Sequence, residues 1–362
     1  MAKKHGLGKA VRPRRPPAAA PVVPAAAPQP HVRPSYFGAV GPSTYEEAIL
    51  NSILRGRQVH NLPDEASLLG SALSSISGSM RDLQYRSGIH IGRSLYRIDN
   101  SVKHYLFPEE AIADLVEFFE AAGYRYVTYI ALSDKIEISM FDGKGPDVGT
   151  NLHSFEAGII SGFISSAKHR YIAVEEVECV HNKHDSCRFI PVAHKGAPRA
   201  AIDEVAVLDR LAGHIAERAK HPSSHSGSAL HAEMSGEYYS LMFKMLFDKS
   251  YIEAVKSIAS YMGVSVGEKI FGPEGTAIAP QARMLRAMDT IRLLKFGEPT
   301  IKKSRPLHIS VSFGGLTSKK EYVDVSLAYI SALLSARFGT GLVATERSRG
   351  GAYVIDIKER NA

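Results

Sequence analysis

One order of helices and strands recurs along this chain, and that recurrence restricts the fold more than any single motif does. The first occurrence is a helix, a strand pair, a second helix and a second strand pair, predicted at residues 109–122, 126–132, 135–141, 155–168, 171–180 and 188–192. The second occurrence is a helix, a strand, a helix and a strand pair, predicted at residues 237–261, 308–313, 322–338, 341–345 and 352–357. We therefore expect an α+β fold with two diverged copies of an antiparallel sheet covered by helices, the second copy being the degenerate one.

Residues 109–122 carry the clearest helical pattern. Ile112, Leu115 and Phe119 recur at helical spacing, and Gly123 predicts the end of the helix. Upstream, one helix is expected to begin within residues 43–46 and to run through Leu54. Another is expected over residues 65 to about 84, with Gly88 and Gly92 following it.

The charge of the chain lies almost entirely before Tyr45. That segment holds seven of the 44 Lys and Arg residues and no Asp or Glu, which leaves 37 basic residues to balance all 37 acidic ones. It also holds nine of the 19 prolines and many alanines, a composition that cannot offset the entropy of ordering. We therefore predict a disordered basic arm over residues 1–42. Its cations would contact an anionic partner such as nucleic acid or a ribonucleoprotein, through Lys3, Lys4, Lys9, Arg12, Arg14 and Arg15; the alternative is a solubilising tail.

Composition also predicts the domain boundaries and the compartment. We expect folded copies at residues 43–195 and 229–362, joined by residues 196–228, which hold an amphipathic helix and a Ser- and His-rich linker. No apolar run reaches the length of a membrane span, and no secretory signal is visible. Two cysteines cannot build a disulfide framework, so we expect a cytoplasmic protein in which those thiols bind a metal or undergo redox chemistry.

Two neighbouring segments carry a specific motif. The first, residues 153–162, has the spacing A-G-x-x-x-G within a predicted helix. The second, residues 174–189, holds E-x-x-C at the end of a strand and then C-R-F. The short segment between Cys179 and Cys187 is called the knuckle below. Together the two segments resemble the 4-vinyl-reductase domain family over about residues 45–193, and more weakly over residues 230–360. The resemblance implies helix-covered antiparallel sheets that hold small apolar molecules, as in an accessory protein of chlorophyll-type pigment synthesis and the sensor domains of phenol-responsive activators.

The same resemblance implies a zinc site. In the phenol-sensor branch a zinc ion is held by Cys, Glu, Cys and Cys, and this chain keeps the separations of 23, three and eight residues with His in the first place. Imidazole is as good a zinc ligand as thiolate, so the implied set is four-coordinate and structural. Its members are His153, Glu176, Cys179 and Cys187.

Strand geometry leaves alternatives open. Side chains alternate between the two faces of a strand, so Glu176 and Cys179 meet at one ion only if the strand bulges or ends before Cys179. In a regular strand Glu175 is the better-placed carboxylate. A third set uses the knuckle alone, with His181 and His184 between the two cysteines, and a fourth reading has no metal at all.

The second copy bears on the role of the metal. At the corresponding positions it has Tyr322 in place of His153 and Arg349 in place of Cys179. The second copy therefore lacks the ligand set. An ion that one copy can do without is more simply explained as a structural ion that holds neighbouring segments together, a zinc staple, than as a reaction centre.

We expect a non-enzymatic protein that binds or senses a small apolar or aromatic molecule, with one structural zinc ion per chain. No catalytic residues are predicted, and the residues of the ligand pocket are not identified. Two further functions stay open: an adaptor on nucleic acid or a ribonucleoprotein, and an accessory reductase of tetrapyrrole metabolism. The two copies would pack as a pseudo-dimer, and homodimerisation is an alternative.

Overall fold

The computed structural model describes residues 45–54, 61–62, 70, 72, 78–124, 126–132, 135–141, 146–192, 202–220, 234–235, 241, 251–272, 278–304, 306–313, 320–339, 342–349 and 352–359. The predicted arm, including its six named cations, lies outside the described residues. So does the linker at residues 221–228. Most of residues 65–77, in the helix predicted over residues 65 to about 84, and most of residues 237–250, in the helix predicted over residues 237–261, also lie outside the described residues.

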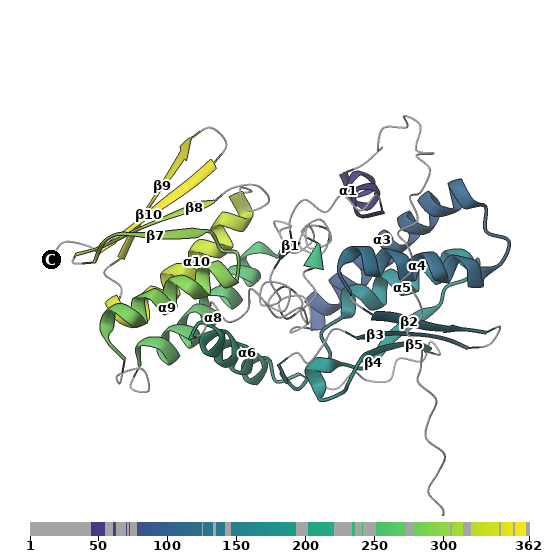
Figure 1. Ribbon diagram of the computed structural model, residues 1–362, viewed down its shortest axis with the longest axis horizontal. Helices are drawn as coiled ribbons and strands as arrows, with labels where there is room; N and C mark the ends of the chain where they lie inside the picture. Colours follow the sequence, from purple (N-terminus) through teal and green to yellow (C-terminus); the bar gives the residue numbers. More distant parts are fainter. Residues whose placement is uncertain are drawn as a thin grey trace, which may run out of the picture. The chain divides into compact units, whose positions relative to one another are not determined.

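The first copy is a four-stranded antiparallel sheet with helices on one face (Figure 1). Along the chain its elements are α1 (Tyr45–Leu54), α3 (Gly78–Lys103), α4 (Pro108–Ala122), β2 (Tyr126–Ala131), β3 (Ile136–Phe141), α5 (Ser154–Ala167), β4 (Ala173–Glu178), the 3-10 turn η1 (Val180–Asn182) and β5 (Cys187–Val192). The strand order in the sheet is β2-β3-β5-β4, so the last strand lies between the second and third.

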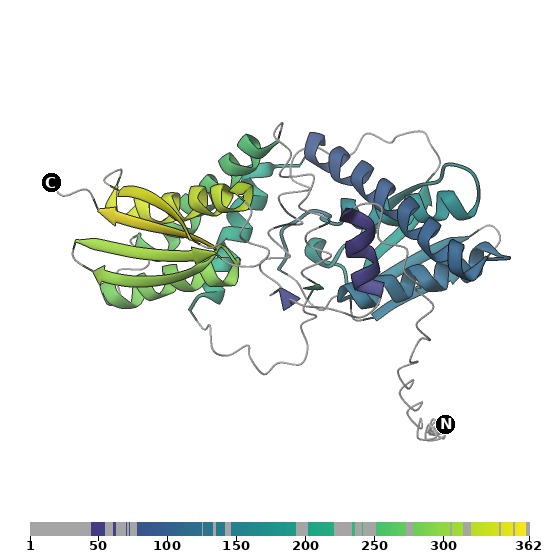
Figure 2. The same cartoon turned by 90° about the horizontal axis from the view of Figure 1, so that it is seen from above.

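The second copy repeats this topology. Its elements are α8 (Ile252–Phe271), α9 (Pro280–Leu293), β7 (Glu298–Ser304), β8 (Leu307–Phe313), α10 (Lys320–Phe338), β9 (Leu342–Arg349) and β10 (Ala352–Glu359). Its strand order is β7-β8-β10-β9, again antiparallel, and Figure 2 shows these strands in green and yellow. The predicted fold class, two copies of a helix-covered antiparallel sheet, is confirmed. The amphipathic helix expected after the first copy is α6 (Glu204–Arg218), which packs against α8.

Two short strands complete the described elements. β1 (Asn61–Leu62) pairs antiparallel with β6 (Met234–Ser235). None of the described helices is long and apolar enough to cross a membrane.

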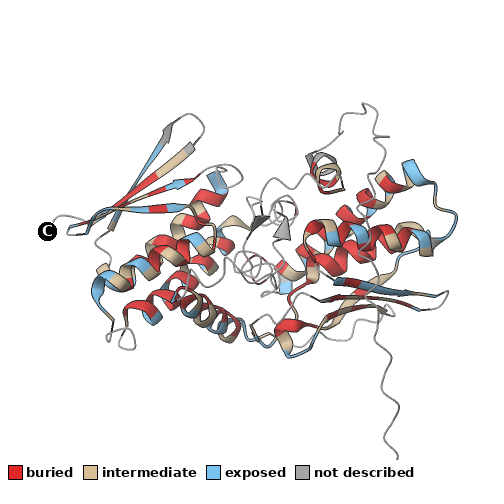
Figure 3. Ribbon diagram, viewed as in Figure 1, coloured by how far each residue is buried: buried red, intermediate tan, exposed pale blue. Residues whose placement is uncertain are grey.

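The core of each copy lies between its helices and the inner face of its sheet (Figure 3). In the first copy Phe163 of α5 and Phe189 of β5 are both buried, and in the second Tyr329 of α10 and Phe313 of β8 are buried. This arrangement follows from alternation along the strands: in β8 the buried residues Leu307, Ile309, Val311 and Phe313 occupy every second position.

The predicted stop near residue 84 is wrong, because α3 continues through both glycines to Lys103. A Cβ atom on Gly88 would lie 2.2 Å from the carbonyl oxygen of Phe155, and one on Gly92 would lie 2.0 Å from that of Ile159. These glycines therefore let the backbones of α3 and α5 touch. In the second copy Gly263 plays the same part, since its Cβ would lie 2.3 Å from the carbonyl oxygen of Tyr329 in α10.

Candidate metal centre

Four buried side chains converge where α5 begins and β4 ends. His153 is the N-cap of α5, Glu176 lies in β4, Cys179 directly follows that strand, and Cys187 opens β5. The side chains of His153 and Glu176 are 4% and 5% exposed, and both cysteines are buried. Three separate elements thus deliver their ligand atoms to one enclosed point.

A break in β4 makes this convergence possible. Glu176 pairs with Phe189 of β5, but Glu178 pairs with the adjacent Arg188, so the register shifts between them. β4 then ends at Glu178, one residue before Cys179. The bulge and the end of the strand are the two conditions under which Glu176 and Cys179 could share a face.

The ligand atoms are close enough to hold a metal ion. One ligand atom from each of the four side chains can be chosen so that all lie within 4.8 Å of one another. Nδ1 of His153 lies 2.7 Å from Oε1 of Glu176 and 3.5 Å from Sγ of Cys179. The two Sγ atoms are 3.9 Å apart. Among the described residues, these four form the group of His, Cys, Asp and Glu side chains whose ligand atoms lie close enough together to hold a metal ion.

The electrostatics of the cluster favour the charged forms of His153, Glu176 and Cys187 and the neutral form of Cys179. Burial disfavours a charged imidazole, but the negative charges of Cys187 and Glu176 raise the pKa of His153 well above its ordinary value. Burial likewise opposes ionisation of Glu176, yet the charge of His153 and its hydrogen bond lower the Glu176 pKa. The interaction of the two thiols lowers the pKa of Cys187, whereas burial raises the pKa of Cys179. Without a metal the cluster therefore pairs a cationic imidazole with anionic groups of Glu176 and Cys187, and an ion that binds here must displace the protons of His153 and Cys179.

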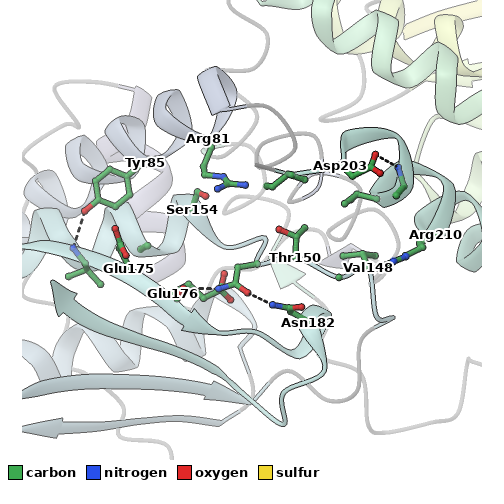
Figure 4. Close-up of a pocket in the computed structure, with 17 residues that line it drawn as sticks. Arg81, Tyr85, Val148, Thr150, Ser154, Glu175, Glu176, Asn182, Asp203 and Arg210 are labelled. Atoms are coloured by element: carbon green, nitrogen blue, oxygen red, sulfur yellow. Dashed lines mark hydrogen bonds between the residues drawn. The ribbon is translucent and has the colours of Figure 1, made fainter. Parts of the chain in front are cut away.

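The backbone around Glu176 is braced by two asparagines. Nδ2 of Asn151 donates to the carbonyl oxygen of Glu176 at 2.7 Å, and Nδ2 of Asn182 donates to Oδ1 of Asn151 at 3.1 Å (Figure 4). The amide of His153 also donates to Oε2 of Glu176 at 3.0 Å. Sequence reasoning missed both asparagines, whose only signal was their proximity along the chain to His153 and to the knuckle.

The alternative ligands predicted from sequence lie elsewhere. Glu175 pairs with Ile190 and is outside the cluster. His181 is buried and stacks on His153, with ring centroids 5.6 Å apart, but its Nδ1 lies 3.2 Å from the carbonyl oxygen of Pro146. Burial lowers the His181 pKa to about 4. His184 is exposed, so the structure does not bring the knuckle set together.

The second copy joins the same two elements with an ion pair. Nζ of Lys320, the first residue of α10, lies 2.6 Å from Oε2 of Glu346 in β9. Tyr322, expected to correspond to His153, is buried and donates its hydroxyl to the carbonyl oxygen of Lys295 at 3.3 Å. In both copies, side-chain contacts thus join the start of the helix before the third strand to that strand, through α5 and β4 in the first copy and through α10 and β9 in the second. The four-ligand cluster is found in the first copy.

A cavity of about 400 Å³ lies beside the cluster, and Glu176 is part of its wall (Figure 4).

Comparison of the chain with protein-family models, with curated proteins and with solved structures found no match.

Proposed function

We propose that this chain is a non-enzymatic small-molecule-binding protein whose first copy is held together by one structural zinc ion. The observation that carries the proposal is the convergence of His153, Glu176, Cys179 and Cys187 within 4.8 Å. Two thiols, an imidazole and a carboxylate are donors that zinc prefers, and four protein ligands complete a tetrahedral shell.

The burial of the cluster supports a structural role over a catalytic one. A catalytic zinc site keeps a position for water or substrate, whereas four protein ligands close the coordination shell. Both cysteines are almost inaccessible to solvent, at 0% and 1% exposure. The ion would tie the start of α5 to β4 and to the start of β5.

The small-molecule part of the proposal rests on two supports. The resemblance to the 4-vinyl-reductase family implies binding of an apolar or aromatic ligand. The cavity beside the cluster, at about 400 Å³, falls within the range of about 300–1,000 Å³ typical of ligand pockets. Turnover of a tetrapyrrole by the purified chain would favour the accessory-reductase alternative instead.

The zinc content of purified protein tests the proposal. We expect one zinc per full-length chain after zinc-replete expression, measured by elemental analysis and native mass spectrometry. Cys187→Ser should lose the ion and destabilise the first copy by several kcal/mol, because ion binding contributes directly to folding. His184→Ala is the matched control, since it removes an exposed imidazole from the same knuckle. A cooperatively folded wild-type chain without metal would refute the zinc staple.

Two further variants separate the ligand sets. His153→Cys replaces imidazole with the thiolate of the phenol-sensor pattern and should retain the ion, whereas His153→Ala should weaken its binding. His181→Gln should retain it, because His181 faces a backbone carbonyl. Loss of zinc in His181→Gln alongside retention in His153→Ala would assign the ion to the knuckle set.

A second candidate function is association with nucleic acid through residues 1–42. The observation that favours it is the concentration of the chain's net positive charge of seven before Tyr45. Lys and Arg side chains neutralise phosphates without reading sequence, so such binding would be salt-sensitive and nonspecific.

A further inference from the structure

β2 lies at the edge of the first sheet that is farthest from β4 and the metal centre (Figure 1). The strand order is β2-β3-β5-β4, and among the described strands β2 pairs with β3 alone. An edge strand leaves a row of backbone amides and carbonyls unpaired, so another strand can add to it. The side chains of the edge decide whether such addition is favoured.

The edge formed by residues 126–132 is apolar and uncharged. Tyr126, Ile130 and Leu132 are 69%, 41% and 57% exposed, and the segment contains neither a charged residue nor a proline. Its pairing with β3 continues over the whole strand without a register shift. Exposed edge strands usually carry charges, proline or bulges that prevent pairing with another chain. An edge without any of these features indicates a surface that another strand covers.

The other three edges of the two sheets carry the features that prevent pairing. β4 has three glutamates and a register shift. β7, which occupies the same place in the second copy as β2 in the first, has a glutamate, a proline, two lysines and a register shift. β9 has a glutamate and two arginines. Of the described edges of these sheets, β2 alone is uncharged. A second β2 is therefore the edge of this chain that β2 can meet without bringing charge or proline into the contact.

The unpaired backbone groups of β2 belong to every second residue. The amide of Leu132 donates across the hairpin to the carbonyl oxygen of Lys135 at 2.7 Å, so Leu132 bonds toward β3. The direction of bonding alternates along an antiparallel pair. The residues that direct their amide and carbonyl groups to the open edge are therefore Val127, Tyr129 and Ala131. The carboxylate of Glu120 in α4 already accepts the amide of Val127, which leaves the other two amides for a partner strand.

We propose that β2 pairs with β2 of a second molecule of this chain, antiparallel and about a two-fold axis, which joins two four-stranded sheets into one. The available groups bond when Tyr129 lies opposite Ala131 of the partner subunit, and this register places Ile130 opposite its own counterpart. Residues directly opposite each other in an antiparallel pair share a face, so the helices of both molecules stay on one side of the joined sheet. The contact is isologous and closes with two chains. It goes beyond the proposed function, because it uses neither the cavity nor the metal centre.

Sedimentation velocity on the full-length chain over a concentration series tests the proposal. We expect a species of twice the 39.4 kDa of one chain, in a proportion that rises with concentration. Ile130→Lys sets two like charges opposite each other and removes an apolar contact, so it should raise the Kd of the dimer by about tenfold or more. Thr300→Lys is the matched control, because it adds the same charge at an exposed position of β7 and should leave the Kd unchanged.

Two further measurements assign the contact to β2, and the first does not depend on the folding of Ile130→Lys. Ile130→Cys should form a disulfide between two chains on mild oxidation, because the Cβ atoms of opposite residues lie about 4.5–5.5 Å apart. Thr300→Cys should not form one. Hydrogen exchange followed by mass spectrometry should show that residues 126–132 exchange more slowly in the wild-type dimer than in Ile130→Lys.

Several outcomes would overturn the proposal. One is a wild-type chain that stays monomeric over the whole concentration series. Another is a dimer with the same Kd in Ile130→Lys as in the wild type, because such a dimer uses another surface. Equal weakening by Ile130→Lys and Thr300→Lys would trace the effect to net charge. Protection of residues 126–132 in a monomer, lost in a chain beginning at Ser43, would assign the edge to the chain's own residues 1–42.

Discussion

Nδ1 of His153 lies 2.7 Å from Oε1 of Glu176, although 23 residues separate them along the chain. The same carboxylate accepts the backbone amide of His153 through its other oxygen. Two contacts therefore fix the first residue before α5 against the bulged end of β4. The cluster is positioned by backbone as well as by side chains, which limits the rearrangement needed when an ion binds.

The close approach of α3 and α5 predicts a contrast between two glycine substitutions. Gly92→Ala would place a Cβ atom 2.0 Å from the carbonyl oxygen of Ile159 and should destabilise the protein by about 1–3 kcal/mol through overpacking. In Gly213→Ala, within α6, the new Cβ atom would lie 3.9 Å from Cε of Lys269, an ordinary van der Waals contact, and the substitution should stabilise the protein by up to about 1 kcal/mol. Urea unfolding measures both values. Equal effects of the two substitutions would contradict the helix contact.

These glycines also mark the limit of sequence reasoning about the fold. The helix at residues 109–122 and the hairpin that follows were predictable, because a local apolar period and Gly123 suffice to define them. The continuation of α3 through Gly88 and Gly92 was not, since what favours glycine there is a helix more than 60 residues away. α9 and β7 were also missed: Arg283 is buried in α9, and Lys302 and Lys303 interrupt the apolar pattern of β7.

The ligands of the metal centre were likewise only partly predictable from the sequence. The resemblance to the phenol-sensor pattern identified the four candidate residues, but strand geometry left Glu175 and Glu176 as alternatives, because a regular strand places them on opposite faces. The register shift after Glu176 depends on pairing with β5, which the β4 sequence does not encode by itself. The cavity beside the cluster was not foreseen either, since α3, α5 and α6 each contribute only a few of its residues.

Asp356 of β10 should make the stability of the second copy sensitive to acid. Burial opposes ionisation of this carboxylate, but the hydrogen bond with His308 at 3.2 Å and the charge of Arg347, also 3.2 Å away, lower its pKa overall. A lowered folded pKa means that the ionised form stabilises the fold above the unfolded pKa of about 3.9, and that this contribution disappears as the pH falls further.

Asp356→Asn should therefore be less stable than the wild type at pH 7, and the difference should shrink at pH 3. The free energy of unfolding, measured at both pH values, checks this expectation. A difference that stays constant between pH 7 and pH 3 would show that the charge of Asp356 contributes nothing and that only its shape matters.

The basic arm predicts a salt-dependent interaction with nucleic acid. Each phosphate contact releases counterions, so seven cations on duplex DNA give a log–log slope no steeper than about −6. A chain beginning at Ser43 should retain its zinc and lose this binding. Fluorescence anisotropy with a random duplex over a series of salt concentrations measures the slope for both chains. Equal binding by the shortened chain would leave the arm as a solubilising tail.

X-ray absorption at the zinc edge on the full-length protein tests the central claim most directly, because it reports the atoms bound to the ion. The account predicts one ion surrounded by two sulfur atoms at about 2.3 Å and two nitrogen or oxygen atoms at about 2.0–2.2 Å. Cys187→Ser, if it retains any ion, should show at most one sulfur. A wild-type shell made only of nitrogen and oxygen would contradict the assignment of Cys179 and Cys187 as ligands, and with it the staple between α5, β4 and β5.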